Sequence, residues 1–253
     1  MPYRVAVTID WNEELAEQLD WHWRANLRPR LEGLTDEEYF WEPVPGMWSV
    51  RPRSTSLAPV PLGGGDYTYD WGWSPDPAPA TTIAWRLSHL IVGVFGRRAA
   101  AHFGAPAVDF ETYQYPGDAA TALVRLDEVY NAWTDGVRKL DAAALARSCG
   151  PAEGAWADSP MATLVLHINR EALHHGAEIA LLRDLYRWQS QLPLAVAVVA
   201  RGGLSPVRPA AVPPDREDPP RRPPQPHRPP PGQIFAPPPS TSQFAYRRAR
   251  QLP

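Results

Sequence analysis

Apolar residues recur at steps of three or four residues in four separate stretches of this 253-residue chain. The stretches lie at 10–33, 81–104, 118–145 and 159–188. This spacing places the apolar side chains on one face of an α-helix, and each such face has to be buried against a neighbouring element. Sustained alternation of apolar and polar residues is absent, so the pattern requires no strands. The sequence therefore predicts an all-α fold, a four-helix bundle.

Residues that favour helix ends stand at the boundaries of these stretches. Asp10 is the expected N-cap of the first helix and Asp118 that of the third. Ser159 followed by Pro160 is typical of the start of a helix, with the proline at the first helical position. Pro29 lies inside the first stretch and predicts a kink or a break there.

Two segments do not fit the helical pattern. Residues 43–80 are rich in Pro, Gly, Ser and Trp and predict a long irregular loop, whose aromatic side chains either cover a pocket or close the edge of the core. Residues 191–253 form a low-complexity tail; the part after Arg201 holds 16 of the 31 prolines and predicts disorder. Three interpretations of this tail remain open: a docking segment, a passive tail, or the product of a shifted reading frame. We therefore expect a helical domain over residues 1–190, followed by this tail.

Composition excludes several classes of function. The formal net charge of −3 offers no general attraction for nucleic acid, and the nine arginines after residue 200 stand among prolines that break any helix. Cys149 is the only cysteine, which excludes an internal disulfide and a cysteine-rich zinc site. The N-terminal residues do not resemble a signal peptide, and the longest apolar run, 192–200, is far shorter than the ~20 residues of a membrane span. We expect a soluble cytoplasmic protein that acts on a small molecule; a homodimer is compatible with these data.

The fourth helical stretch carries an unusual set of polar residues. His167, Glu171 and His175 follow one another at four-residue steps, which places them on one stripe of the helix, about 40° apart. Glu171 and His175 offer a carboxylate and an imidazole one turn apart, a pair suited to a divalent metal. His174 points about 100° away from His175 and is expected at the surface or behind the ligands.

A third ligand has to come from another helix, and His89 is the best choice. It stands in the apolar stretch "WRLSHLIVGVF", where an unpartnered imidazole is costly to bury. A hydrogen-bonded core histidine is the competing interpretation. Two histidines and one carboxylate leave coordination positions open and suit zinc, ferrous iron, nickel or manganese. His167 is the substitute ligand. A second E-x-x-H and an H-E-x-x-H motif are both absent, which argues against the di-iron and zincin patterns.

Three segments of the sequence resemble the DinB-like superfamily, in particular its actinobacterial branch near mycothiol-dependent maleylpyruvate isomerase. They are "LRPRLEGLTDEEYFWEPVPGMWSVRP", "TTIAWRLSHL" and "LHINREALHHGAEIALLRDLY", and the likeness covers about residues 10–190. The resemblance implies a four-helix bundle that holds a divalent metal, commonly zinc, through a histidine of the second helix and two residues one turn apart on the last. The matching positions here are His89, Glu171 and His175.

The resemblance also implies a chemistry, in which a low-molecular-weight thiol such as mycothiol loses its proton at the metal and attacks an electrophile. A thiol-dependent transferase or isomerase is the leading hypothesis, and a non-catalytic metal- or ligand-binding bundle is the alternative. His22 is expected to line the cavity, and Arg86 or Arg170 to hold an acidic group, unless they serve ordinary surface roles. The isomerase that this sequence resembles has a second folded domain after the bundle, whereas this chain has a Pro/Arg-rich segment there. We therefore do not carry over maleylpyruvate as the substrate.

Overall fold

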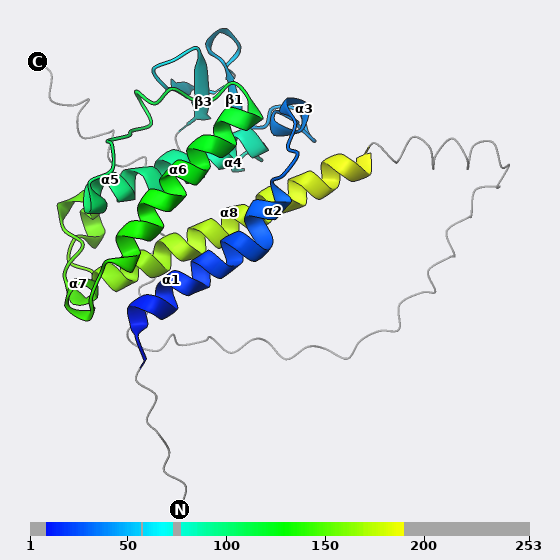
Figure 1. The fold of residues 1–253 in the computed structure, drawn as a ribbon. Helices are drawn as coiled ribbons and strands as arrows, with labels where there is room; N and C mark the ends of the chain where they lie inside the picture. The colour runs from blue at the N-terminus through cyan, green and yellow to red at the C-terminus, as the bar shows by residue number, and fades with distance from the viewer. Residues whose placement is uncertain (1–8, 57, 73–76, 190–253) are drawn as a thin grey trace, which may run out of the picture. The chain divides into compact units, whose positions relative to one another are not determined.

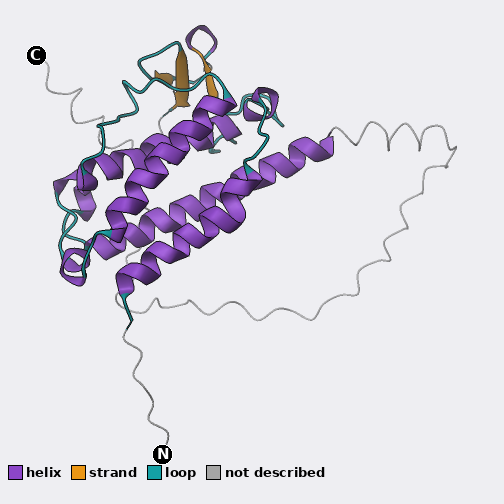
Figure 2. Cartoon of the chain, viewed as in Figure 1, coloured by secondary structure: helices purple, strands orange, loops and turns teal. Residues whose placement is uncertain are grey.

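Helices make up most of the described chain in this computed structural model, which describes residues 9–56, 58–72 and 77–189 (Figure 2). Four long helical segments run through it, at residues 11–30, 83–103, 119–138 and 161–189 (Figure 1). The first comprises α1 (Trp11–His22), the π-helix η1 (Trp23–Leu27) and α2 (Arg28–Arg30). The second comprises α4 (Ile83–Ser88), the π-helix η3 (His89–Gly96) and α5 (Arg97–Phe103). The third and fourth are α6 (Ala119–Arg138) and α8 (Met161–Gln189).

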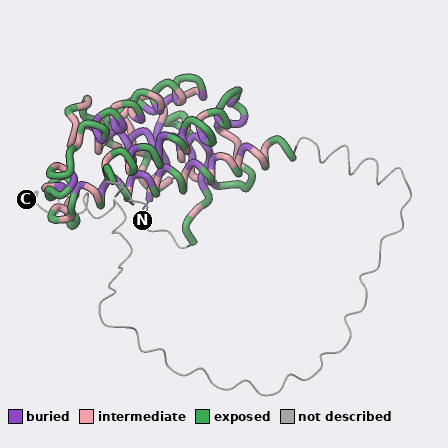
Figure 3. Tube along the Cα trace, turned by 60° about the horizontal axis from the view of Figure 1, so that its bottom comes forward, coloured by how far each residue is buried: buried purple, intermediate pink, exposed green. Residues whose placement is uncertain are grey.

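The long helices bury the faces that the apolar spacing predicts. α1 packs against α6 and α8, and α4 packs against the same two helices. Figure 3 shows the buried positions on the inner sides of these helices and the exposed ones outside. Leu19, Trp23, Leu27 and Leu31 of the first stretch are at most 4% exposed. The shared core explains why each amphipathic helix is stable in this chain, since helix propensity alone seldom holds one.

The predicted helix ends are confirmed at two of three places. The Asp10 side chain accepts hydrogen bonds from the backbone N–H groups of Asn12 and Glu13, and Asp118 accepts one from Thr121. The expectation for the fourth helix is wrong: α8 begins at Met161, while Pro160 pairs with Ser148 in an isolated β-bridge. Pro160 takes part in this bridge, and the first helical residue is therefore Met161.

The sequence predicts a kink or a break at Pro29, and the helix does not break there. The helix continues through Arg30, and η1 lies immediately before the proline. A proline ring normally collides with the carbonyl four residues earlier. The wider turn of a π-helix moves that carbonyl away, so the chain accommodates Pro29 without ending the helix.

The prediction of an all-α chain with an irregular loop at 43–80 is wrong in one respect, because this segment contains a three-stranded sheet. Its strands are β1 (Val50–Pro52), β2 (Val60–Leu62) and β3 (Tyr67–Trp71), in the order β1-β3-β2. Both pairings are antiparallel, with Val50 opposite Tyr69 and Val60 opposite Trp71. Pro52 and Pro61 stand in the two edge strands, where a missing N–H is tolerated.

The shorter elements lie at the two ends of the long helices. Figure 1 shows the sheet and α3 (Asp36–Tyr39) near the start of α4, and α7 (Ala142–Ala146) at the opposite end. The 3-10 helix η2 (Arg53–Thr55) follows β1, and η4 (Pro151–Trp156) precedes α8. None of the helices in the described part of the chain has the length and apolar content that a membrane span requires. The predicted tail at 191–253 lies outside the described residues.

Candidate metal centre

His89 stands at the point where the second long helix changes from α to π geometry. Thr82 caps the start of α4, and Trp85, one turn into the helix, stacks its ring on the His89 imidazole at 5.5 Å. The Trp85 indole Nε1–H donates to the backbone carbonyl of Asp70 at 2.9 Å. The small sheet therefore holds Trp85, and Trp85 holds one face of His89. Rare π-helical segments are frequently found at functional sites.

The other side of the His89 imidazole rests on its own helix. A Cβ atom added at Gly93 would lie 3.0 Å from His89 Nδ1 and 2.9 Å from the Phe110 ring, so only glycine leaves room here. Nδ1 is buried and has no hydrogen-bond partner among the described residues. Burial, reinforced by the neighbouring His175, lowers the pKa of His89 to about 3. The imidazole is therefore neutral at physiological pH, the form that binds a metal.

Glu171 and His175 face each other across one turn of α8. His175 Nε2 lies 3.6 Å from Glu171 Oε2, and both side chains are partly shielded from solvent. The contact with His175 lowers the pKa of Glu171 to about 2, although burial acts in the opposite direction. The carboxylate is therefore ionised at physiological pH and able to act as an anionic ligand.

The structure brings His89, Glu171 and His175 together, and we call these three residues the candidate triad. Their ligand atoms all lie within 4.8 Å of one another. A tetrahedral ion with bonds of about 2.0–2.2 Å needs ligand atoms roughly 3.4 Å apart, so small side-chain rotations suffice to close the site. Two imidazoles and a carboxylate, with His89 neutral and Glu171 ionised, form a donor set that fits zinc and other first-row divalent metals.

A second carboxylate, which the sequence analysis missed, orients His175. Glu178 Oε2 lies 2.8 Å from His175 Nδ1 and can accept a hydrogen bond from that nitrogen, while Arg86 Nη1 lies 3.3 Å from the same Nδ1. His175 Nε2 lies on the other side of the ring and faces Glu171. Arg86 donates to the same Glu178 oxygen and fixes it from α4. Carboxylates commonly orient metal-binding histidines in this way.

The remaining predicted residues are not part of the candidate triad. His167 Nδ1 is 3.6 Å from Glu171 Oε1 and 2.6 Å from Arg170 Nη2. The side chain of Arg170 is 68% exposed and that of His174 is 63% exposed. His22 lies half-buried at the end of α1, and burial lowers its pKa. Among the described residues, the group whose ligand atoms converge with those of His89 contains neither His22 nor His167.

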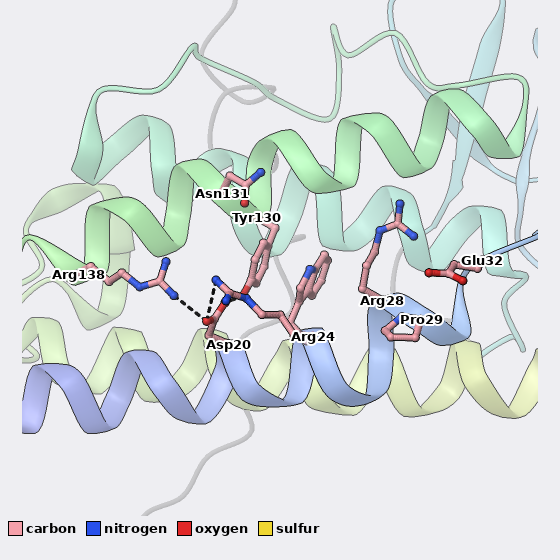
Figure 4. A pocket seen from close by; sticks show the side chains of 9 residues that line it. Asp20, Arg24, Arg28, Pro29, Glu32, Tyr130, Asn131 and Arg138 are labelled. Atoms are coloured by element: carbon pink, nitrogen blue, oxygen red, sulfur yellow. Dashed lines mark hydrogen bonds and ion pairs between the residues drawn. The ribbon is translucent and has the colours of Figure 1, made fainter.

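Two surface cavities are lined by residues outside the candidate triad. One, of about 520 Å³, is largely apolar and lies between α1 and α8, where Arg170 and His174 help to line it. The other, of about 330 Å³, lies between the first long helix and α6 (Figure 4).

The charges in this second cavity compensate one another. The Tyr130 hydroxyl donates to Asp20 at 2.7 Å, and Arg138 and Arg24 pair with the same carboxylate at 2.8 and 3.1 Å, as the dashed lines in Figure 4 show for the two arginines. Arg28 is paired with Asp127 at 2.8 Å. We therefore interpret the charged side chains around this cavity as a network of ion pairs that stabilises the fold.

Comparison with known families now identifies the scaffold. The sequence matches the DinB superfamily over residues 18–52 and 68–179, a range that includes all three residues of the candidate triad. The chain belongs to the DinB superfamily. The unmatched interval between the two ranges, residues 53–67, includes β2 and the start of β3. No curated protein and no solved structure matches the chain.

Proposed function

We propose that this DinB protein is a cytoplasmic enzyme that binds one divalent metal through His89, Glu171 and His175 within a four-helix bundle. Zinc is the first choice, and nickel, iron or manganese suit the same donors. The observation that carries the proposal is the convergence of the three ligand atoms within 4.8 Å, on residues from two different long helices. Proteins of this superfamily generally bind a divalent metal, which supports the assignment.

We further propose that the reaction is a thiol-dependent transfer or isomerisation on a small electrophile, with a low-molecular-weight thiol such as mycothiol as co-substrate. A divalent ion at the candidate triad supplies Lewis acidity, which lowers the pKa of a thiol or a water. The residues of the chain hold the ligand side chains in position. Glu178 orients the His175 ring through its contact with Nδ1, and Arg86 holds Glu178 in place. Three protein ligands leave coordination positions open, as catalytic sites require.

A turnover assay tests the catalytic half of this proposal. The zinc-loaded protein is incubated with mycothiol, or with other small thiols, and a chlorinated dinitrobenzene; sulfur replaces chloride on the ring, and the thiol proton is released. We expect thioether formation by the wild type and its loss in Glu171→Gln. His167→Gln, one turn away on the same stripe, is the matched control and should keep both metal and turnover. Tight metal binding without turnover across several thiols would instead show a non-catalytic metal-binding protein.

A further inference from the structure

Arg98, His102 and Glu153 form a cluster at the C-terminal end of the long helical segment that carries His89, and the proposed function gives them no role. Arg98 and His102 belong to α5, and Glu153 belongs to η4. Their side chains are 19%, 6% and 8% exposed. Glu153 Oε2 pairs with Arg98 Nη2 at 3.4 Å, and Oε1 pairs with His102 Nε2 at 3.0 Å. Each charge of the cluster is thereby paired, as a buried charge has to be.

Arg98 makes one further contact, which points from this cluster toward His89. Its Nη1 donates to the backbone carbonyl of Gly93, five residues earlier and inside the π-helical segment His89–Gly96. The helix returns to α geometry at Arg97. Where the helix type changes, the carbonyls at the boundary bond to different backbone N–H groups than they would in a continuous α-helix. The Arg98 guanidinium supplies a donor to one of these carbonyls and so fixes the end of the π segment.

Gly93 is also the residue on which the His89 imidazole rests. The position of a Cβ atom at Gly93 lies 3.0 Å from Nδ1 and 3.1 Å from Cε1 of His89. The backbone at Gly93 therefore sets how far the imidazole can move toward its own helix. A chain of contacts thus connects Glu153 to Arg98, Arg98 to the Gly93 carbonyl, and Gly93 to His89.

We propose that Arg98, anchored by Glu153 and His102, is a positioning residue of the metal centre: it fixes the Gly93 carbonyl and thereby the His89 imidazole. This inference rests on the proposed function, because it requires His89 to be a ligand. A cluster that only stabilised the fold would tie α5 to η4 without affecting the metal centre, and the two roles are separable by experiment.

The test compares three variants of the full chain by competition titration of zinc against a chromogenic chelator. Arg98→Met removes the donors, and we expect metal affinity to fall about 10–100-fold, the usual effect of losing a residue that orients a ligand. Arg98→Lys keeps a donor for Gly93 and should restore most of the affinity. Arg183→Met is the matched control, because Arg183 is also buried, pairs with a carboxylate and donates to backbone carbonyls. It should lower the melting temperature and leave the metal affinity unchanged.

A second readout needs no metal. Histidine ring resonances of the metal-free protein, recorded by ¹⁵N NMR, should shift for His89 in Arg98→Met and stay in place in Arg183→Met. Wild-type affinity in Arg98→Met, or an equal loss in Arg183→Met, overturns the positioning role while leaving the proposed function intact. A wild type that binds no metal, with His89 resonances that still respond to Arg98→Met, overturns the proposed function and reduces Arg98 to a structural role.

Discussion

Replacing Arg183 by methionine removes the donors of the most deeply buried ion pair that the structure describes. Arg183 Nε and Nη2 donate to the two carboxylate oxygens of Glu38 at 2.6 and 2.9 Å, and the two side chains are 2% and 4% exposed. The guanidinium also donates to the backbone carbonyls of Arg30, the last residue of α2, and of Glu32, two residues beyond it. The pair thus fastens α8 to α3 and to the end of α2.

The expected loss follows from what the substitution leaves behind. Methionine fills most of the space but leaves the Glu38 carboxylate buried without a counter-charge, which costs about 3–5 kcal/mol in the free energy of unfolding. For a folded part of this size, that loss corresponds to a melting temperature lower by about 6–20 °C. Replacing both partners by apolar residues, in Glu38→Leu with Arg183→Met, leaves no buried charge and should recover part of the loss.

Urea unfolding followed by circular dichroism measures these free energies. The adjacent pair of Arg30 with Asp184 is the control, because its side chains are 44% and 48% exposed, and Asp184→Asn should cost at most about 1 kcal/mol. The reasoning is refuted if Arg183→Met costs no more than Asp184→Asn. It is also refuted if the double variant is less stable than Arg183→Met alone.

Three further predictions concern the metal centre. Glu178→Gln should weaken zinc binding about 10–100-fold in a chelator competition, whereas His174→Gln, whose side chain is 63% exposed, should not. Because burial depresses the pKa of His89 from 6.5 to about 3, the unfolded chain binds more protons in that range, and the metal-free protein should lose stability as pH falls below 6.5. His89→Gln should flatten this dependence of melting temperature on pH, and an unchanged slope would contradict the assigned pKa. Gly93→Ala should weaken zinc binding by displacing the imidazole, whereas Gly65→Ala, whose added Cβ meets its nearest neighbour at an ordinary 3.5 Å, should leave the measured affinity unchanged.

The long helices were predictable from the sequence because their signal is local. Apolar spacing and capping residues such as Asp10 and Asp118 act within a few residues of each helix end, and the structure keeps both caps. The sheet was not predictable in the same way. β1 and β2 have three residues each, and β3 is buried at three consecutive positions, so no alternation marks it. β1 and β3 are stabilised by pairing and by packing against α4, and β2 by pairing with β3, which are tertiary effects.

The residues of the candidate triad also differ in how far the local sequence predicts them. The pairing of Glu171 with His175 follows from one turn of helix, and the sequence predicts it directly. His89 was assigned from the cost of burying a lone imidazole and from a family resemblance, and the structure brings its ligand atoms near the other two. Glu178 and Arg98 were missed. Their roles depend on side-chain conformations and on the π-helical register of η3, which apolar spacing does not encode.

The content of bound metal tests the central claim most directly. The wild type and Glu171→Gln are purified without chelators, checked for folding by circular dichroism, and analysed by elemental mass spectrometry. Our account predicts one divalent ion per folded wild-type chain and its loss in the folded Glu171→Gln variant. A wild type that is metal-free after exposure to zinc, or a variant that retains a full equivalent, would contradict the assignment of His89, Glu171 and His175 as the metal ligands.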